Sequence, residues 1–237
     1  MLSGIERARL IAEELGLVFA TDARDGQTVV SGTVAVTVTG SPIQISKAEE
    51  LVLGALSKSS GIATAARKAK AAVGSRCRVV CGGSKKMPSE IKELVRQAVI
   101  DGGLDVRMLD QPFVYLDKNY VRILGGVKRA LEAVAHLGRP TVIQVRGKLQ
   151  PIDDEGLLAA QGGAKVIMVD TGKSADLGSV LRTLRENGLR SSVEVAFSGN
   201  IELDDIETIS RAGADVLDIG YAILDAPCLP VRFDVVA

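Results

Sequence analysis

The residues best suited to chemistry are two adjacent lysines that follow a short apolar segment and two glycines. Lys85 and Lys86 come directly after Gly82-Gly83-Ser84, and Pro88-Ser89 behind them favours the first turn of a helix. The glycines allow a sharp turn and a close approach to a ligand, and the lysines offer positive charge. Because α/β proteins bind ligands at the carboxyl ends of their strands, this stretch predicts an anion-binding loop. A solvated loop with two surface lysines is the alternative.

Glycine-containing segments also follow the last two apolar runs of the chain. Ser198-Gly199-Asn200 and Gly220-Tyr221 stand where α/β barrels commonly bind a phosphate through backbone N–H groups. Both segments are also ordinary turn sequences. A phosphate site and plain turns are therefore two open interpretations of the same residues.

A carboxylate ends another apolar run. Asp170 follows residues 165–169, so its side chain is predicted to leave a buried strand at the ligand-binding face, where it suits ribose hydroxyls or Mg²⁺. N-capping of a turn at Thr171-Gly172 is the structural alternative. Two further apolar runs end in Asp117-Lys118-Asn119 and in Arg146.

An alternation of strands and helices accounts for these positions. We predict strands at 78–81, 105–108, 113–116, 141–145, 166–170, 193–197 and 216–219, and helices at about 89–101, 125–137, 152–162, 174–187 and 202–212. The alternation implies parallel strands joined by right-handed crossovers. The predicted class is therefore α/β, with a closed or partly open α/β barrel. An open doubly wound sheet is the alternative, but no Gly-x-Gly-x-x-Gly follows a strand to support it.

The first part of the chain has a different pattern. Its apolar spacing predicts an amphipathic helix at 3–15, a small β unit at 17–45 and a helix at 47–73 with a break near 59–61. We therefore predict a small N-terminal α+β domain with its linking helix at 1–75, followed by an α/β barrel that carries the active site at 76–237.

Composition and charge limit the partners. Among 237 residues, 29 are Lys or Arg and 29 are Asp or Glu, so no global field attracts nucleic acid or an anionic membrane. The three cysteines, Cys77, Cys81 and Cys228, are odd in number and lack zinc-type spacing, which fits a reducing compartment. The one histidine, His136, lies in a predicted helix and offers no catalytic pair. With no leader-like or membrane-spanning pattern, we expect a cytoplasmic protein with small-molecule ligands.

Several motifs occur in an order typical of one enzyme family. Ser60-Gly61-Ile62-Ala63-Thr64 comes first, and Lys85 with Pro88 follows. They resemble the Ser-Gly-Ile-Ala-Thr signature and part of the Arg-Lys-Thr-x-Pro loop of quinolinate phosphoribosyltransferases, also called nicotinate-nucleotide pyrophosphorylases. The other matches are Asp25-Gly26 with Gly32, Gly102-Gly103 with Arg107, Asn119, Gly125-Gly126, Asp170, Ser198-Gly199 and Gly220. The resemblance covers nearly the whole chain from about Asp25, with a shorter N-terminal domain.

The resemblance implies an activity and an assembly. The family transfers 5-phosphoribose from phosphoribosyl pyrophosphate to the ring nitrogen of quinolinate, uses Mg²⁺ and releases carbon dioxide, as a step of NAD biosynthesis. It also implies a homodimer or larger homo-oligomer, in which the N-terminal domain of one subunit helps to cover the barrel of the other.

The resemblance and the strand-end positions together assign roles to residues. Catalytic roles fall on Lys85, Arg107 and Asp170, and Asp170 is also the Mg²⁺ ligand. Substrate-binding roles fall on Ser84, Lys86, Lys118, Asn119 and Gln144. Phosphate-binding roles fall on Ser198, Gly199, Asn200, Gly220 and Tyr221. Such chemistry needs positive groups for the phosphates and carboxylates for the metal and the ribose.

The acceptor-binding half departs from the family pattern. Ser84 and Glu50 stand where the family has Arg, and Val106 stands where it has His. Asp117 stands where the family has Lys, although Lys118 is adjacent, and Gln144 stands where the family has a carboxylate. Because a dicarboxylate needs fixed cations in a dry pocket, these changes predict a changed acceptor and poor use of quinolinate. The alternatives are a barrel lyase or isomerase that uses Lys85 or Lys86, and a noncatalytic metabolite-binding relative.

Overall fold

The computed structural model describes residues 1–236, and these residues form two compact units. Unit 1 contains Met1–Ala71, Gly83–Val106 and the C-terminal segment from Gly220. Unit 2 contains Ala72–Gly82 and Arg107–Ile219. The chain therefore leaves unit 1 and returns to it twice. Because the units are not two consecutive stretches, the division into domains at residue 75 stays a prediction.

Unit 2 is built on one sheet of six parallel strands. In spatial order these are β3 (Arg78–Val80), β8 (Val216–Asp218), β7 (Glu194–Ser198), β6 (Val166–Asp170), β5 (Thr141–Val145) and β4 (Val114–Leu116). Every residue of β5 is buried, as expected for parallel strands covered on both faces. The last strand returns beside the first, while β3 and β4 do not pair with each other within residues 1–236. The predicted partly open α/β barrel is thereby confirmed.

One predicted strand was wrong. Residues 105–108 form no strand, and only an isolated bridge occurs at Asp105. The reason is that Met108 is buried among inward-facing strand residues such as Val142 and Val166. Its carbonyl accepts a hydrogen bond from the Arg78 guanidinium at 3.1 Å. A side chain thus satisfies a backbone group that we had assigned to a strand ladder.

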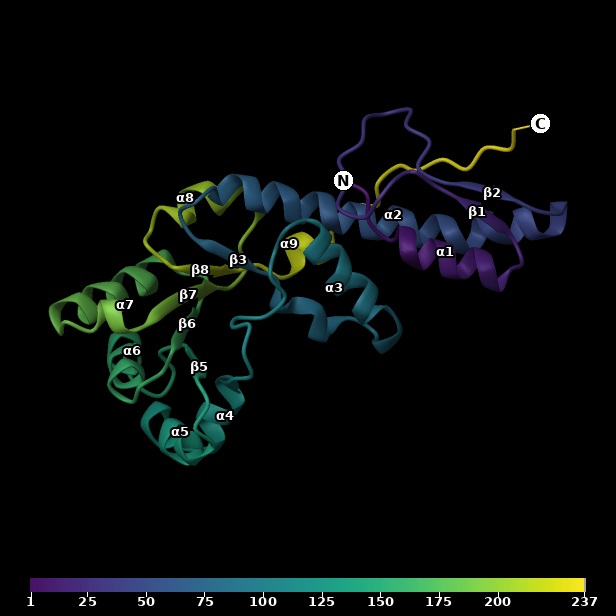
Figure 1. Cartoon of the computed structure of the whole chain (residues 1–237). Coiled ribbons are helices and arrows are strands. Elements are labelled where there is room, and N and C mark those ends of the chain that lie inside the picture. Colours follow the sequence, from purple (N-terminus) through teal and green to yellow (C-terminus); the bar gives the residue numbers. More distant parts are fainter. Residues whose placement is uncertain (237) are drawn as a thin grey trace. The chain divides into compact units, whose positions relative to one another are not determined.

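The helices of unit 2 lie along the strands. Figure 1 shows α5 (Val127–Val134), α6 (Ile152–Gln161) and α7 (Ser174–Glu186) on one side of β5 to β8. The other helical segments are α4 (Lys118–Ile123), η3 (Ala135–Leu137), η4 (Arg190–Ser192), η5 (Leu203–Asp205) and α8 (Ile206–Ser210). Sequence reasoning missed α4, although its start is well defined. Asp117 caps it by accepting the N–H groups of Asn119 and Tyr120 at 2.9 and 3.1 Å.

Unit 1 contains the predicted amphipathic helix and small β unit. These are α1 (Ile5–Glu14) and the antiparallel pair β1 (Val18–Ala20) and β2 (Thr37–Thr39). The other elements are η2 (Ser89–Ile91), α3 (Lys92–Asp101) and α9 (Tyr221–Leu224), with η1 (Gly82–Lys86) at the boundary between the units. Figure 1 shows α1 beside the long helix α2 (Pro42–Val73), and Ile5, Ala8 and Val52 pack in their shared core.

The helix α2 is continuous, so the break predicted near 59–61 was wrong. It also begins at Pro42, earlier than predicted, with proline in the first turn, where a missing N–H costs nothing. Gly61 has another purpose. A Cβ at this position would lie 2.1 Å from the carbonyl oxygen of Pro227, so glycine permits the C-terminal segment to pass close to the helix.

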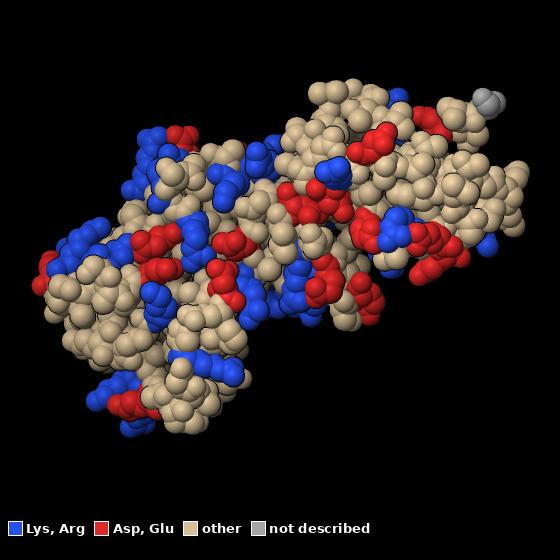
Figure 2. Space-filling view, viewed as in Figure 1, with Lys and Arg blue, Asp and Glu red and all other residues tan. Residues whose placement is uncertain are grey.

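The charges on the surface are mixed. Figure 2 shows Lys and Arg side chains interspersed with Asp and Glu over the visible face, in keeping with 29 residues of each sign. No extended basic surface of the kind that binds nucleic acid is seen on that face.

The packing of Gly61 can be tested against a second glycine of the same helix. Gly61→Ala is expected to lower the free energy of unfolding by about 1–3 kcal/mol, because the new methyl group has to displace the Pro227 carbonyl. Gly54→Ala is the matched control, since its Cβ would meet nothing within 4 Å. It is expected to raise the free energy of unfolding by about 0.5–1 kcal/mol through helix propensity. Denaturant titration measures both, and an unchanged Gly61→Ala protein would contradict the close approach.

Candidate functional site

Three polar residues lie side by side at the carboxyl ends of β6, β7 and β8. The strand register pairs Asp170 with Ser198 and Ser198 with Asp218. Residues paired across neighbouring strands project from the same face of a sheet, so the hydroxyl stands between two carboxylates. Asp170 and Ser198 were predicted as site residues. Asp218 was missed because it was read as part of an apolar strand at 216–219.

A chain of contacts holds Asp170. The Oε1 of Gln144 accepts the backbone N–H of Lys118 at 2.7 Å, and the Nε2 of Gln144 donates to Oδ2 of Asp170. The Nε of Arg146 lies 3.7 Å from the same carboxylate oxygen, and the Asp170 side chain is only 20% exposed. The structure therefore brings together Lys118, Gln144 and Asp170, all predicted, and adds Arg146.

Tyr115 is a further residue that sequence reasoning missed. Its hydroxyl donates to Sδ of Met168 at 3.5 Å. Burial raises the pKa of Tyr115, and the carboxylates of Asp218, Asp170 and Asp117 raise it further. The phenol therefore stays protonated well above neutral pH and adds no charge beside these carboxylates. Its inward position follows from the register of β4 with β5, which sequence alone does not provide.

The segment after β7 has an unusual backbone. Gly199 has φ +115 and Asn200 has φ 51, the one non-glycine residue with positive φ among residues 1–236. A Cβ on Gly199 would lie 2.5 Å from the backbone nitrogen of Gly172, whose N–H donates to the carbonyl of Ser198 at 3.0 Å. Close packing of the loops after β6 and β7 thus explains the glycine by itself. The phosphate-binding role of this segment stays a prediction.

The two lysines lie on a helical turn of unit 1. Lys85 and Lys86 are exposed at the end of η1. Ser84 is buried, and its hydroxyl accepts a hydrogen bond from Nε of Arg96 at 3.3 Å. The turn therefore presents the lysines to solvent, while the serine is engaged within the fold.

The glycine at the end of β8 lies against the same turn. A Cβ on Gly83 would be 3.1 Å from Cα of Gly220, so only glycine fits there. Gly220 precedes the single helical turn α9, and the side chain of Tyr221 is 37% exposed. The structure thus brings the lysine turn of unit 1 together with the predicted segment Gly220-Tyr221.

Two predicted residues stand apart from the Asp170 contacts. Arg107 lies in the segment before β4, with its guanidinium 5.8 Å from the ring centre of Phe113. Asn119 is exposed in the first turn of α4. Within residues 1–236, neither side chain shares a hydrogen bond or ion pair with Asp170.

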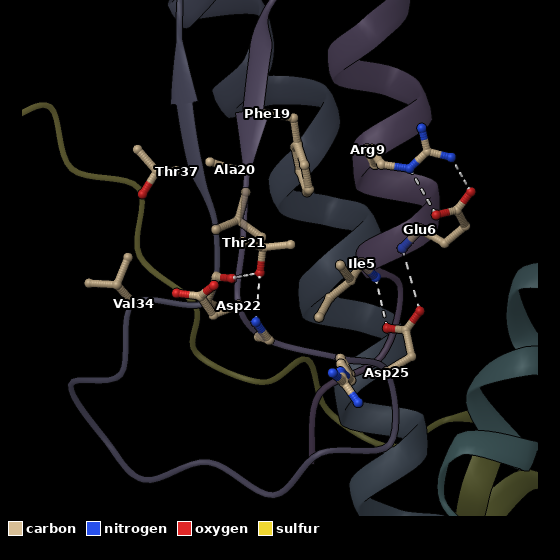
Figure 3. Close-up of a pocket in the computed structure, with 14 residues that line it drawn as sticks. Ile5, Glu6, Arg9, Phe19, Ala20, Thr21, Asp22, Asp25, Val34 and Thr37 are labelled. Carbon is tan, nitrogen blue, oxygen red and sulfur yellow. Dashed lines mark hydrogen bonds and ion pairs between the residues drawn. The ribbon is translucent and has the colours of Figure 1, made fainter.

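A hollow of about 820 Å³ lies in unit 1 and contains none of the predicted site residues. Figure 3 shows Arg9 turned toward Glu6 and Asp25 turned toward the start of α1. Asp25 accepts the N–H of Ile5 at 2.9 Å and caps the helix, and Arg9 is paired with Glu6 and Glu13. These charges serve the fold, so the strand ends of unit 2 remain the candidate site.

The donor set of the strand ends suits one kind of metal ion. No group of three or more His, Cys, Asp or Glu side chains within residues 1–236 is arranged to hold a metal. Mg²⁺, however, often takes only one or two carboxylates and receives its other oxygens from substrate phosphates and water. Asp170, Ser198 and Asp218 present oxygen ligands in one row. They therefore fit a Mg²⁺ ion that arrives with a diphosphate.

Two further observations concern membrane-spanning helices and the cysteines. None of the helices in the described chain is long and apolar enough to cross a membrane. Within residues 1–236 no disulfide bond is formed by the three cysteines, of which Cys77 is half-buried, Cys81 is buried and Cys228 is exposed.

A parallel α/β barrel with carboxylates at the carboxyl ends of its strands is the architecture of a ligand-binding barrel enzyme. A protein-family model described as "Quinolinate phosphoribosyl transferase, C-terminal domain" matches residues 62–234. The chain therefore belongs to the quinolinate phosphoribosyl transferase family, and the resemblance predicted from the motifs is confirmed.

Archaeal relatives are similar over most of their length. The chain is 27% identical to a probable nicotinate-nucleotide pyrophosphorylase (carboxylating) of Methanothermobacter thermautotrophicus, covering 95% of this chain and 81% of the relative. It is 25% identical to the protein of the same name from Archaeoglobus fulgidus, covering 97% and 88%. The solved nicotinate-nucleotide pyrophosphorylase from Pyrococcus furiosus shares the fold, with TM-score 0.83, 21% identity, and 97% and 63% coverage. These matches favour a phosphoribosyltransferase over the lyase, isomerase and noncatalytic alternatives.

The environment of Tyr115 predicts a pH dependence. Because its pKa is raised in the folded state, the unfolded state binds fewer protons above about pH 10, and stability falls as the pH rises. Tyr115→Phe removes this linkage. Between pH 9 and pH 11 the wild type is expected to lose up to about 1.4 kcal/mol relative to the variant. Denaturant titrations at both pH values measure the difference, and parallel pH profiles would show that the phenol is not shielded as described.

Proposed function

We propose that this protein transfers 5-phosphoribose from phosphoribosyl pyrophosphate to the ring nitrogen of quinolinate, with release of pyrophosphate and carbon dioxide. The observation that carries the proposal is the family match over 62–234, a range that includes the whole six-stranded sheet and the Asp170–Ser198–Asp218 row. Both archaeal relatives bear the name of this activity, which supports quinolinate over the changed acceptor predicted from sequence.

The row of polar residues suits the electrostatics of this reaction. When the bond between ribose C1 and pyrophosphate breaks, positive charge develops on the ribose ring. We propose that the carboxylates of Asp170 and Asp218 stabilise that charge while the acceptor nitrogen forms the new bond to C1. Gln144 and Arg146 fix the orientation of Asp170, because both contact its Oδ2. Tyr115 remains neutral and contributes no competing charge.

The negative charge of the leaving pyrophosphate needs cations. We propose that Lys85 and Lys86 supply them from their exposed turn, and that Mg²⁺ enters with the pyrophosphate and takes Asp170 as its protein ligand. Bound Mg²⁺ would supply positive charge to the leaving oxygen atoms. Arg107 completes the proposed catalytic set as a further cation.

The remaining predicted residues bind the rest of the substrates in this proposal. The backbone of Ser198-Gly199-Asn200 and Gly220-Tyr221 binds the ribose phosphate, and Ser84, Lys118, Asn119 and Gln144 belong to the substrate-binding set. We further propose that the protein works in the cytoplasm and as a homodimer. Light scattering of the purified protein tests the assembly, and a monomer at micromolar concentration would contradict it.

A steady-state assay tests the proposed reaction. Purified protein with Mg²⁺, phosphoribosyl pyrophosphate and quinolinate is expected to form nicotinate mononucleotide, pyrophosphate and carbon dioxide, with kcat/KM of at least about 10⁴ per molar per second. Removal of Mg²⁺ with EDTA is expected to abolish turnover, and added Mg²⁺ should restore it. Mass spectrometry identifies the nucleotide, and its absence at saturating substrate would sink the proposal.

Two variants separate the proposed roles. Asp170→Asn is expected to lower kcat about 10²–10³-fold, because an amide cannot stabilise positive charge on the ribose. Lys85→Ala is expected to raise KM for phosphoribosyl pyrophosphate about 10–100-fold through loss of a charged hydrogen bond. Arg182→Gln is the control, since Arg182 is exposed on α7 and, within residues 1–236, its side chain forms a single hydrogen bond, to the Ser179 hydroxyl. If Lys86→Ala raises this KM and Lys85→Ala does not, Lys86 rather than Lys85 binds the pyrophosphate.

A further inference from the structure

We propose that a basic hollow beside Asp170 binds a carboxylate of the acceptor ring. The hollow is lined by four cations: Lys118 and Arg122 from α4, and Arg146 and Lys148 from the loop after β5. The inference rests on the proposed function, because it names how the acceptor of that reaction is recognised. Of the four cations, only Lys118 was predicted as a site residue.

The positive charge of the basic hollow is not neutralised. Within residues 1–236, the side chains of Lys118, Arg122 and Lys148 make no ion pair or hydrogen bond. The Nε of Arg146 lies 3.7 Å from Oδ2 of Asp170, and this buried nitrogen has no hydrogen-bond partner in the described part of the chain. Within residues 1–236 the two terminal nitrogens of Arg146 form no hydrogen bond either, so the planar end of the guanidinium is available for a ligand. Three cations without a counter-ion beside this open guanidinium point to an anionic ligand.

The one acidic side chain in the lining, Glu155, leaves the hollow with net positive charge, because four cations line it. Glu155 is 3% exposed, and its Oε2 accepts the N–H groups of Arg146 and Gly147, each at 2.8 Å. Its Oε1 accepts the N–H of Leu149 at 3.3 Å. A carboxylate from α6 thus fixes the loop that carries Arg146 and Lys148. The backbone beneath two of the cations is set before a ligand arrives, which lowers the cost of binding.

The basic hollow is small. Its volume of about 20 Å³ is little more than the roughly 10–15 Å³ that holds one water molecule, so it takes one small anionic group. A guanidinium matches a carboxylate with two parallel hydrogen bonds. We assign the hollow to a carboxylate of the acceptor, and the KM values of the two substrates distinguish this assignment from a phosphate site.

The cations of the basic hollow lie outside the motif positions at which the family has its cations. Ser84, Val106 and Asp117 carry no positive charge, and on that ground quinolinate was predicted to bind poorly. Arg122, Arg146 and Lys148 provide positive charge from other positions. Because Arg146 also lies 3.7 Å from Asp170, a carboxylate held in the hollow keeps its ring next to the row where the ribose is proposed to react.

Three substitutions test the basic hollow in the full-length protein. Arg122→Gln and Lys148→Gln are each expected to raise KM for quinolinate about 10–100-fold, with KM for phosphoribosyl pyrophosphate changed less than twofold. Arg146→Gln is expected to raise KM for quinolinate by a similar factor and also to lower kcat, because Arg146 lies against Asp170. Arg146→Lys should recover part of the loss, because it restores the charge without the fork. Arg182→Gln is the control from a surface outside the hollow. Circular dichroism verifies folding, and the exposed Arg122 and Lys148 keep the test valid if the Arg146 variants misfold.

The outcomes distinguish this inference from the proposed reaction. A higher KM for phosphoribosyl pyrophosphate with unchanged KM for quinolinate would assign the hollow to a phosphate and overturn the inference, while the proposed reaction stands. If the wild type turns over no quinolinate, calorimetry with quinolinate and nicotinate decides. Binding to the wild type that is lost in Arg122→Gln and Lys148→Gln supports a carboxylate site. Equal binding in all proteins, or no binding to the wild type, overturns it.

Discussion

The parallel pairing of β6, β7 and β8 is the constraint on which the site depends. These strands are buried along most of their length, so polar side chains are tolerated only where each strand reaches its carboxyl end. The register then places Asp170, Ser198 and Asp218 in one row. The loops beyond the row pack so closely at Gly172 and Gly199 that neither position accepts a side chain. The geometry of the site is therefore fixed by the sheet rather than by its loops.

Gln144 shows how the charges around this row are balanced. An amide can accept and donate at once, whereas a carboxylate can only accept. Gln144 uses both functions, since it accepts from Lys118 and donates to Asp170. A glutamate there would place a second negative charge against Asp170 and lose the donor. The departure from the family pattern at this position thus stabilises Asp170, and the neutral phenol of Tyr115 adds no charge to the same group.

The predicted elements differ from the structure where a contact distant in sequence decides the local conformation. Periodicity was sufficient for α1, α6 and α7 and for the strands β5 to β8, because their apolar spacing is long and regular. It was insufficient at residues 105–108, where Met108 turns into the core, and at Gly61, which is needed for the Pro227 carbonyl rather than for a break. The cap at Asp117 that begins α4 was local and could have been recognised.

The sequence by itself determined the family, the α/β class, the order of most elements and the identity of Asp170 and Ser198 as strand-end residues. These follow from local motifs and from the alternation of apolar runs, which depend only on neighbouring residues. The tertiary structure alone decided that Asp218 joins the row, that Tyr115 points inward and that Arg146 and Lys148 share a hollow with α4. The physical reason is that strand register and the contacts of Glu155 join segments whose spacing along the chain carries no signal of their proximity.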